Sequence, residues 1–447
     1  MINKINYSLI NYSYLVIIIP LLLIAGPFFP DLLLSITAIF FLINILTKKI
    51  KFEVNNFFLN ILIIFFIYLL INYLVNSSWK YSVTGSLFYF RFILFAMCIS
   101  YFSLNNKTFN ERFYYLIYFC ILIIALDGYF QFYNGYNTLG FESFCVRDCN
   151  VEAFKSLRLT GFFNKPILGS YIARFLPILL CLFFLVQYEY KKKLSNKFLA
   201  IIVILSSGVV YLSGERTSFF LFMSFVMLFV LITNYSKKYK FIIISGISIL
   251  IILITIFSST VRFRMLTFTL MQMGFKTENI IFLSQDKDII NFISKSIYES
   301  KEKKYYLFSK EHDSHFKSAY YIFLDNIFFG SGLKSFRHVC KQYIINSDSC
   351  TTHPHNLPIQ FLSELGLVGF LFYLFSIITA IFSLVRTYLN KTKLNDLDNA
   401  RICIISGILI SLFPFIPNGN FFNNWLSIIF FIMVGLLFTI LKRKENV

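Results

Sequence analysis

All five histidines of the chain lie between positions 312 and 355. They are His312, His315, His338, His353 and His355. Imidazole is the side chain that changes charge near neutral pH, so such a group indicates a catalytic or pH-sensing site. The simpler interpretation is that this stretch is the one large aqueous segment in which histidine is tolerated.

The last two histidines stand in the sequence Thr-Thr-His-Pro-His-Asn-Leu-Pro, which leads into an apolar segment. Asn356 suits a helix N-cap, and Pro358 suits the first helical turn. His355 is therefore expected at a helix N-terminus, where free N–H groups attract anions and disfavour imidazolium. A neutral imidazole there can accept a proton beside an anion.

The elements that must position these residues are membrane helices. Of 447 residues, 57% are hydrophobic and 14% are charged, against roughly 25% charged in soluble proteins. The apolar residues form blocks of about 18–23, enough to cross a hydrocarbon core of roughly 30 Å. We therefore expect an all-α polytopic membrane protein, which excludes a disordered chain, a coiled coil and a small disulfide scaffold.

The apolar blocks predict about twelve transmembrane helices. They lie near 8–26, 30–47, 56–75, 86–104, 112–134, 166–187, 198–213, 218–234, 241–258, 357–386, 401–418 and 422–441. The net charge is +19, and about twenty basic residues fall in loops on one side against about six on the other. This asymmetry predicts that both termini are cytoplasmic. No secretory cleavage site follows the first block, so we expect it to be a retained helix.

Three regions follow from this layout. Residues 1–258 would hold the first nine helices with an outer loop at 135–165, and residues 259–355 would form a large helical periplasmic loop. Residues 356–447 would hold the last three helices and a cytoplasmic tail.

Arg91 and Arg174 fall inside predicted helices, where charges are usually paired or functional. Asp127 and Glu364 are the partners that we expect for them.

Four of the eight cysteines lie in the two outer segments rather than in predicted helices. These are Cys145, Cys149, Cys340 and Cys350. Two local pairs in an oxidising compartment predict two disulfides, with free thiols as the alternative. A zinc site near His338 and His353 is the weaker interpretation, because the tight spacing of paired zinc ligands is missing.

The spacing of His355, Asn356, Gly366 and Gly369 follows the pattern H-[NSQ]-x₉-G-x-x-G. This pattern resembles that of the bacterial O-antigen ligase and O-antigen polymerase superfamily. The two glycines, three apart, would also permit close helix contact in a bilayer.

Further segments between residues 155 and 385 support the resemblance. Arg158 to Asn164 resembles the family's R-x-x-G-x-F-x-N segment, and Gly214 to Ser218 resembles its S-R-T turn. Asp325 to Gly332, which contains Gly330 and Gly332, resembles its P-L-x-G-x-G stretch.

The chain departs from the family at three positions. Glu215 replaces the serine before the turn arginine, and Ile327 replaces a proline. His312, with His315 close by, holds the place of a loop arginine. If that arginine binds diphosphate in relatives, then Arg337, Lys317 or Lys334 would have to supply the cation in this chain.

The resemblance implies a GT-C-like membrane glycosyltransferase of lipopolysaccharide biosynthesis in the bacterial inner membrane. It would move a glycan from undecaprenyl diphosphate to a sugar of lipid A–core on the periplasmic face. The reaction would be inverting and metal-independent, with no cofactor, and the chain would bind lipid and glycan but no nucleic acid.

The resemblance also implies roles for individual residues. His355 would be the general base, and Arg216 would bind the leaving diphosphate, since its planar fork matches phosphate oxygens. The expected substrate-binding residues are Arg158, His353, Asn356, His315 and Arg337, and the expected structural glycines are Gly330, Gly332, Gly366 and Gly369. In the simpler interpretation, Arg216 only anchors the helix or pairs with Glu215, and Asn356 is only a cap.

Three alternatives stay open. A polymerase would join repeat units on the same lipid carrier, or the glycan would pass to a protein acceptor. The complete H-[NSQ]-x₉-G-x-x-G pattern favours a ligase slightly. A transporter or lipid flippase is less favoured, because we find no internal repeat in the chain.

Overall fold

The computed structural model describes residues 7–50, 56–76, 79–143, 158–191, 194–275, 305–345, 349–389 and 394–445. Within these ranges the chain is helical, with no strand beyond one isolated bridge between Tyr136 and Glu142. The prediction of an all-α polytopic membrane protein is therefore confirmed.

Eight described helices are long and apolar enough to cross a membrane. They are α3 (Phe28–Leu46), α4 (Asn56–Val75), α6 (Phe90–Asn105, with the end of α5, Trp79–Leu87), α7 (Phe109–Asn134), α8 (Leu168–Tyr190), α11 (Lys237–Phe257), α17 (Leu357–Leu389) and α19 (Asn424–Glu445). The count of twelve is not established, because the other four expected segments are short.

Those four segments differ in why they are short. Two of them, α9 (Asn196–Leu212) and α10 (Arg216–Ile232), are apolar helices of 17 residues each. A third, α18 (Asp396–Ser411), has 16 residues and two aspartates in its first turn. The first expected helix is divided into α1 (Tyr7–Ile17) and α2 (Ile19–Ala25), with Pro20 in the first turn of α2. The division falls at Ile18, just before this proline, because proline lacks the N–H that would continue the preceding helix.

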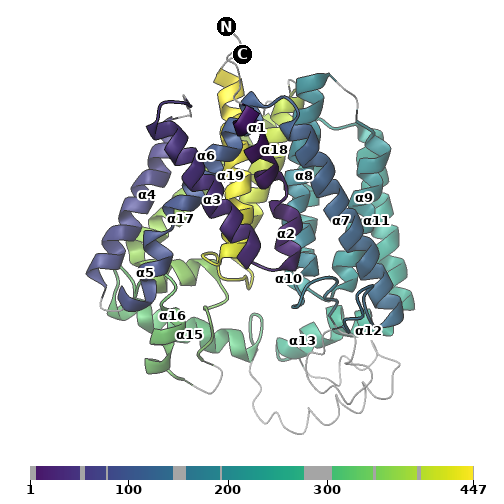
Figure 1. Cartoon of the computed structure of the whole chain (residues 1–447). Helices are drawn as coiled ribbons and strands as arrows, with labels where there is room; N and C mark the ends of the chain where they lie inside the picture. The colour runs from purple at the N-terminus through teal and green to yellow at the C-terminus, as the bar shows by residue number, and fades with distance from the viewer. Residues whose placement is uncertain are drawn as a thin grey trace.

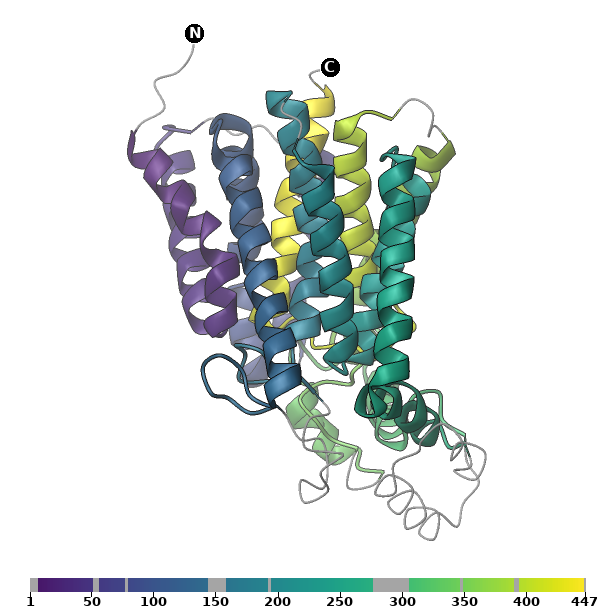
Figure 2. The same ribbon diagram turned by 90° about the vertical axis from the view of Figure 1, so that its right-hand side faces the viewer.

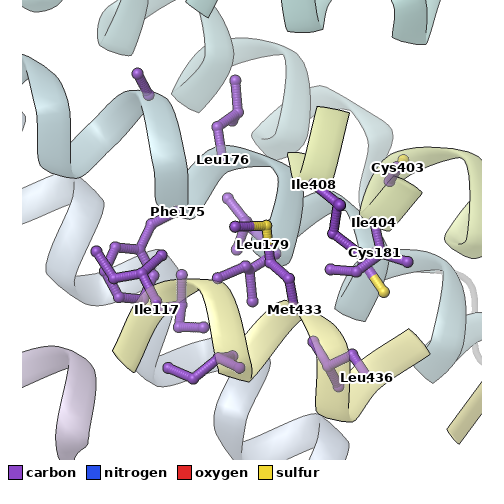
Figure 3. Packing of buried hydrophobic residues seen from close by; sticks show 14 of the residues in the cluster. Ile117, Phe175, Leu176, Leu179, Cys181, Cys403, Ile404, Ile408, Met433 and Leu436 are labelled. Atoms are coloured by element: carbon purple, nitrogen blue, oxygen red, sulfur yellow. The ribbon is translucent and has the colours of Figure 1, made fainter. Parts of the chain in front are cut away.

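The helices run side by side, and both ends of the chain lie at the same end of the bundle (Figures 1 and 2). We call this the termini end. Helix α8 is the central element, with 18 of its 23 residues buried, and it packs against α7, α10 and α18. Figure 3 shows Leu179 of α8 between Ile408 of α18 and Met433 of α19. A Cβ atom on Gly407 would lie 2.6 Å from Pro177 and 2.8 Å from Met433, so this glycine allows the three helices to pack closely.

Short helices gather at the opposite end of the bundle (Figure 1). They are α12 (Ser259–Arg262), the π-helical residues Phe263–Thr267, α13 (Phe268–Gln272), α15 (Lys310–Asp325), α16 (Phe336–Val339) and the 3₁₀ turn Cys340–Gln342. All of them belong to the expected large loop. We call this end the loop end.

Cys340 is joined to Cys350 by a disulfide. Cys340 is fully buried, and it packs with Ala319 and Ile322 of α15 and with Phe336 of α16 in a small hydrophobic cluster. The disulfide therefore links the residues just before His353 to the hydrophobic cluster that packs on α15. Cys145 and Cys149, the other expected pair, lie outside the described residues.

Two glycines let the loop end join α17 through the main chain. At Gly366 the backbone leaves the helical conformation, with φ +62° and ψ −165°. Residues 327–332 lie against this break: Leu367 N–H donates to the Ile327 carbonyl (2.7 Å), and Gly332 N–H donates to the Glu364 carbonyl (2.8 Å). We call this set of hydrogen bonds the main-chain junction.

Neither glycine of the junction has room for a side chain. A Cβ atom at Gly366 would lie 2.4 Å from the Phe328 carbonyl, and one at Gly330 (φ +66°) would lie 2.5 Å from the Glu364 carbonyl carbon. The expectation that Gly366 serves contact between regular membrane helices is therefore wrong. Gly369 likewise meets Leu365 of its own helix, across the break.

Gly366→Ala is expected to destabilise the protein by about 2–6 kcal/mol. The positive-φ, extended backbone at this position costs an alanine about 1–3 kcal/mol, and the overpacked main chain adds about 1–3 kcal/mol. The matched control is Gly135→Ala, because Gly135 has φ +79° but open space around its Cβ position. Thermal unfolding of the two purified variants measures the difference, and equal shifts would contradict the close approach.

Candidate functional site

Four of the five histidines meet at the loop end. His312 and His315 come from α15, whereas His353 and His355 come from the loop that precedes α17. The His355 ring centroid lies 4.0 Å from that of His353, 5.3 Å from that of His315 and 5.7 Å from that of His312. We call these four residues the histidine cluster. His338 lies apart from them as an exposed residue on α16.

One loop between α18 and α19 holds the two later histidines in place. His353 Nε2 lies 3.1 Å from the Asn418 carbonyl oxygen, and Asn418 N–H donates to the His355 carbonyl at 2.8 Å. Because a carbonyl only accepts, Nε2 of His353 must carry the hydrogen, and its Nδ1 then accepts from the Thr352 hydroxyl at 2.9 Å. His355 itself has φ +58°, a conformation that a non-glycine residue keeps only when its surroundings fix it.

The sequence analysis missed this loop. It placed helices at 401–418 and 422–441 with almost nothing between them, whereas α18 ends at Ser411 and α19 begins at Asn424. The signal was present, because residues 414–424 contain two prolines, a glycine and four asparagines, which are turn-forming residues.

In the part of the chain that the structure describes, the ring of His355 is held by ring contacts alone. Within the described residues its ring makes contacts with the other three imidazoles but no hydrogen bond. By contrast, both ring nitrogens of His353 are engaged, and Nδ1 of His312 lies 2.7 Å from the Ser309 hydroxyl.

Three histidines of the cluster are neutral at ordinary pH. Burial and then the three neighbouring imidazoles lower the pKa of His355 to about 2. Burial also lowers the pKa of His353 to about 4, although its hydrogen bond to Asn418 acts in the opposite direction. Burial and then the charge of His315 lower the pKa of His312 to about 4, and Arg216 lowers it further. Arg216 is therefore close enough for its charge to act on the cluster.

Arg216 begins α10 and faces the short helices of the loop end. Its Nη1 donates to the Thr269 hydroxyl at 2.9 Å, and its Nη2 donates to Gln272 Oε1. Its guanidinium also lies 5.8 Å from the ring centre of Phe268.

Arg264 is a buried arginine that was not predicted from the sequence, and its guanidinium lies 5.0 Å from the ring centre of Phe268. It stands in the π-helical turn, a rare element that is frequent at functional sites.

Glu215 does not pair with Arg216, contrary to the simpler interpretation. Its carboxylate accepts hydrogen bonds from Gly169 N–H (2.7 Å), Ser170 N–H (3.2 Å) and the Ser218 hydroxyl (2.9 Å). Burial raises the pKa of Glu215, whereas Arg158 and these hydrogen bonds act to lower it. Glu215 therefore caps the N-terminus of α8, where a carboxylate also suits the helix dipole.

Arg158 lies on the same side of the site as Arg216. Leu159 N–H donates to the Ser213 carbonyl at 3.3 Å, which ties the Arg158 segment to the turn before α10. Arg158 Nη2 donates to the Pro166 carbonyl at 3.3 Å, but its Nε is buried and has no hydrogen-bond partner among the described residues.

Arg337 is the best placed of the three expected replacement cations. It is exposed on α16, and its charge acts on His353. Lys317 forms an exposed ion pair with Asp313 at 3.0 Å. Lys334 lies 3.5 Å from Asn424 Oδ1, and burial lowers its pKa.

Asn356 acts as a helix cap in the structure. Its Oδ1 accepts from Ile359 N–H at 3.3 Å, and its Nδ2 donates to the Pro414 carbonyl at 2.9 Å. Both ends of the amide are thus used in fixing the start of α17 against the end of α18.

The buried arginines have other partners than those expected. Arg174 donates to Asn418 Oδ1 at 2.8 Å and to the Ser170 hydroxyl, so it joins α8 to the loop that holds the histidines. Arg91 forms an ion pair with Asp31 at 2.8 Å.

The acidic residues that were expected to pair with these arginines are engaged locally. Asp127 accepts from Thr138, and Glu364 accepts from Phe336 N–H at 3.3 Å. The expected pairing is therefore wrong.

Among the described residues, no group of three or more histidine, cysteine, aspartate or glutamate side chains is arranged to hold a metal ion. The arrangement is instead a set of neutral imidazoles next to fixed guanidinium groups, which suits proton transfer at one point and binding of an anion at the next.

No curated protein matches the chain in sequence. Residues 201–374 match the family model described as O-antigen ligase. This range contains Arg216, Arg264, the histidine cluster and the main-chain junction. The match supports a relation of this segment to the O-antigen ligase and O-antigen polymerase superfamily.

Proposed function

We propose that the protein is an inverting membrane glycosyltransferase of the O-antigen ligase type. It would transfer a glycan from undecaprenyl diphosphate to a sugar hydroxyl of lipid A–core. The family match supports ligase- or polymerase-type activity on a lipid-linked glycan in a multi-pass membrane protein. The finer statements, on donor, acceptor, inversion and independence of metal, are our proposal.

The observation that carries the proposal is the neutral ring of His355, which lies 5.7 Å from the ring of His312, on which the charge of Arg216 acts. A glycosyl transfer from a diphosphate needs these two functions together. One group must take a proton from the acceptor, and another must meet the charge that develops on the leaving group.

In the proposed step, a ring nitrogen of His355 removes the proton from the acceptor hydroxyl. The hydroxyl oxygen attacks the anomeric carbon and forms the new glycosidic bond. The bond from that carbon to the diphosphate oxygen breaks, and its electron pair leaves with the diphosphate. Arg216 and Arg158 bind the phosphate oxygens, and the attack from the opposite face inverts the anomeric centre.

The low pKa of His355 is consistent with proton transfer that begins only after the donor has bound. An imidazole with a pKa of about 2 is neutral but weakly basic. A nearby anion favours the imidazolium form, so the bound diphosphate would raise the pKa of His355. The base would therefore gain strength only when the donor is present.

The proposed topology places both termini in the cytoplasm and the histidine cluster at the periplasmic face of the inner membrane. It is supported by the excess of basic residues near the termini end and by the position of the cluster at the opposite end of the bundle (Figure 1).

His355→Ala is expected to lower the transfer rate by about 10²- to 10⁴-fold, the usual contribution of a general base. The wild-type chain and the variant would be expressed in a ligase-deficient strain and in a polymerase-deficient strain. We expect wild type to restore the lipopolysaccharide ladder only in the ligase-deficient strain, and the variant to fail.

The matched control is His338→Ala, because His338 is exposed and lies outside the cluster. Rescue of glycan chain length in the polymerase-deficient strain would instead assign polymerase activity. Full activity of His355→Ala, with normal expression in the membrane, would remove His355 from the mechanism and favour a lipid flippase.

Arg216→Ala is expected to lower the turnover of purified protein in liposomes by about 10²- to 10³-fold, as loss of a charge-stabilising donor does in other enzymes. Arg216→Lys should recover part of the rate, since it keeps the charge but loses the planar fork. Lys310→Ala removes an exposed cation from the start of α15 and serves as control. An Arg216→Ala rate equal to that of the control would show that Arg216 only anchors its helix.

A further inference from the structure

A large cavity lies between α4, α17, α18 and α19, and no member of the histidine cluster lines it. Its volume is about 530 Å³, within the range of about 300–1,000 Å³ that is typical of small-molecule sites. The lining is mainly aromatic and aliphatic, with Phe65, Phe372, Phe382, Ile405 and Leu437 among its residues. Between Phe372 and Arg386, α17 rises about 21 Å at 1.5 Å per residue. The cavity thus follows the helix for more than half of a hydrocarbon core of roughly 30 Å.

Two arginines line this otherwise apolar cavity near the termini end. Arg386 comes from the last turn of α17, and Arg401 comes from the second turn of α18. Arg401 Nη2 donates to the Ser383 hydroxyl at 3.0 Å. Its Nε is buried and has no hydrogen-bond partner among the described residues.

The charge of the Asp398 carboxylate acts on Arg401. That carboxylate forms an ion pair with Lys444, and it also accepts from Asn395 N–H in the cap of α18. Asp398 is therefore shared with another cation, and two guanidinium groups face one cavity. A chemical partner for this arrangement carries an anionic group at one end and a long apolar chain at the other.

We propose that the cavity binds an anionic phospholipid from the leaflet at the termini end. The phosphate lies between Arg386 and Arg401, and one acyl chain runs along α17 toward Phe372. Basic pockets between transmembrane helices are known sites for anionic lipid headgroups, and the unpartnered Nε of Arg401 supplies a donor for a phosphate oxygen. The bound lipid fills the space between α17 and the pair α18 and α19, so it stabilises the fold.

We do not assign the arginine end of the cavity to the diphosphate of the glycosyl donor. Under the proposed function that diphosphate would lie beside His355, at the opposite end of α17 from Arg386; the titration below also tests a polyprenyl phosphate directly. The inference does not depend on the proposed function, because it rests on the cavity and the two arginines alone.

The test measures thermal unfolding of the delipidated full chain in detergent against increasing phosphatidylglycerol. Phosphatidylcholine with the same acyl chains is the neutral comparison. Because a ligand that binds the folded state raises its stability, the rise in unfolding temperature with lipid gives an apparent affinity. We expect wild type to prefer phosphatidylglycerol and the double variant Arg386→Gln/Arg401→Gln to bind it about 30-fold more weakly, at about 1 kcal/mol per cation.

Two further variants control for charge and for folding. Lys237→Gln/Lys238→Gln removes the same charge from exposed residues at the start of α11 and should leave the preference unchanged. Arg386→Lys/Arg401→Lys keeps the charge and should retain most of the preference even if the glutamine variant folds poorly.

Three outcomes would overturn the proposal. They are equal effects of the two phospholipids on wild type, an equal loss of affinity in both glutamine double variants, and stabilisation of wild type by a polyprenyl phosphate but not by phosphatidylglycerol. The last result would assign the cavity to a polyprenyl carrier.

Discussion

The histidine cluster depends on the main-chain junction between residues 327–332 and the break in α17. The cluster combines two histidines from α15 with two from the loop before α17. The junction follows α15 in the chain, and its other side lies in the third turn of α17. Backbone hydrogen bonds therefore set the distance between the histidines of α15 and those of the loop before α17. The main chains at Gly330 and Gly366 can come this close because neither residue has a side chain. Tyr68 and Asn72 of α4 add bonds to the Leu365 and Phe329 carbonyls at the same place.

A second layer of contacts fixes the direction of the rings. Asn418 binds main-chain or ring atoms of His353 and His355, and its side chain accepts from Arg174 in the central helix. Glu215, the residue before Arg216 in the sequence, caps the N-terminus of that same helix. The contacts that hold the histidines and those of the residue before Arg216 thus meet on the N-terminal half of α8, the most deeply buried of the candidate membrane spans. Sites of this kind stay ordered because their supporting residues are packed in place.

The sequence was sufficient for the class of protein and for the resemblance to the superfamily. Hydropathy and a fixed motif spacing are local properties, and they can be read along one chain. The role of Gly366 in the main-chain junction could not be predicted. Its neighbour Phe328 is distant in sequence, and the motif specifies only that two glycines stand three residues apart. The same holds for Glu215, which looks like a partner for the adjacent Arg216 but reaches the N-terminus of α8. The count of twelve spans is not established, because apolar composition does not show where a helix of 16 or 17 residues ends.

The crowding of four buried or half-buried imidazoles has a consequence for repeated turnover. Under the proposed function, the proton taken from the acceptor would be held on His355 only while the diphosphate anion is next to it. When that anion departs, the imidazolium stands alone among three other rings and near a guanidinium, where its charge is strongly disfavoured. The proton and the spent lipid carrier would then leave together. The base would return to its starting state without a separate relay to solvent.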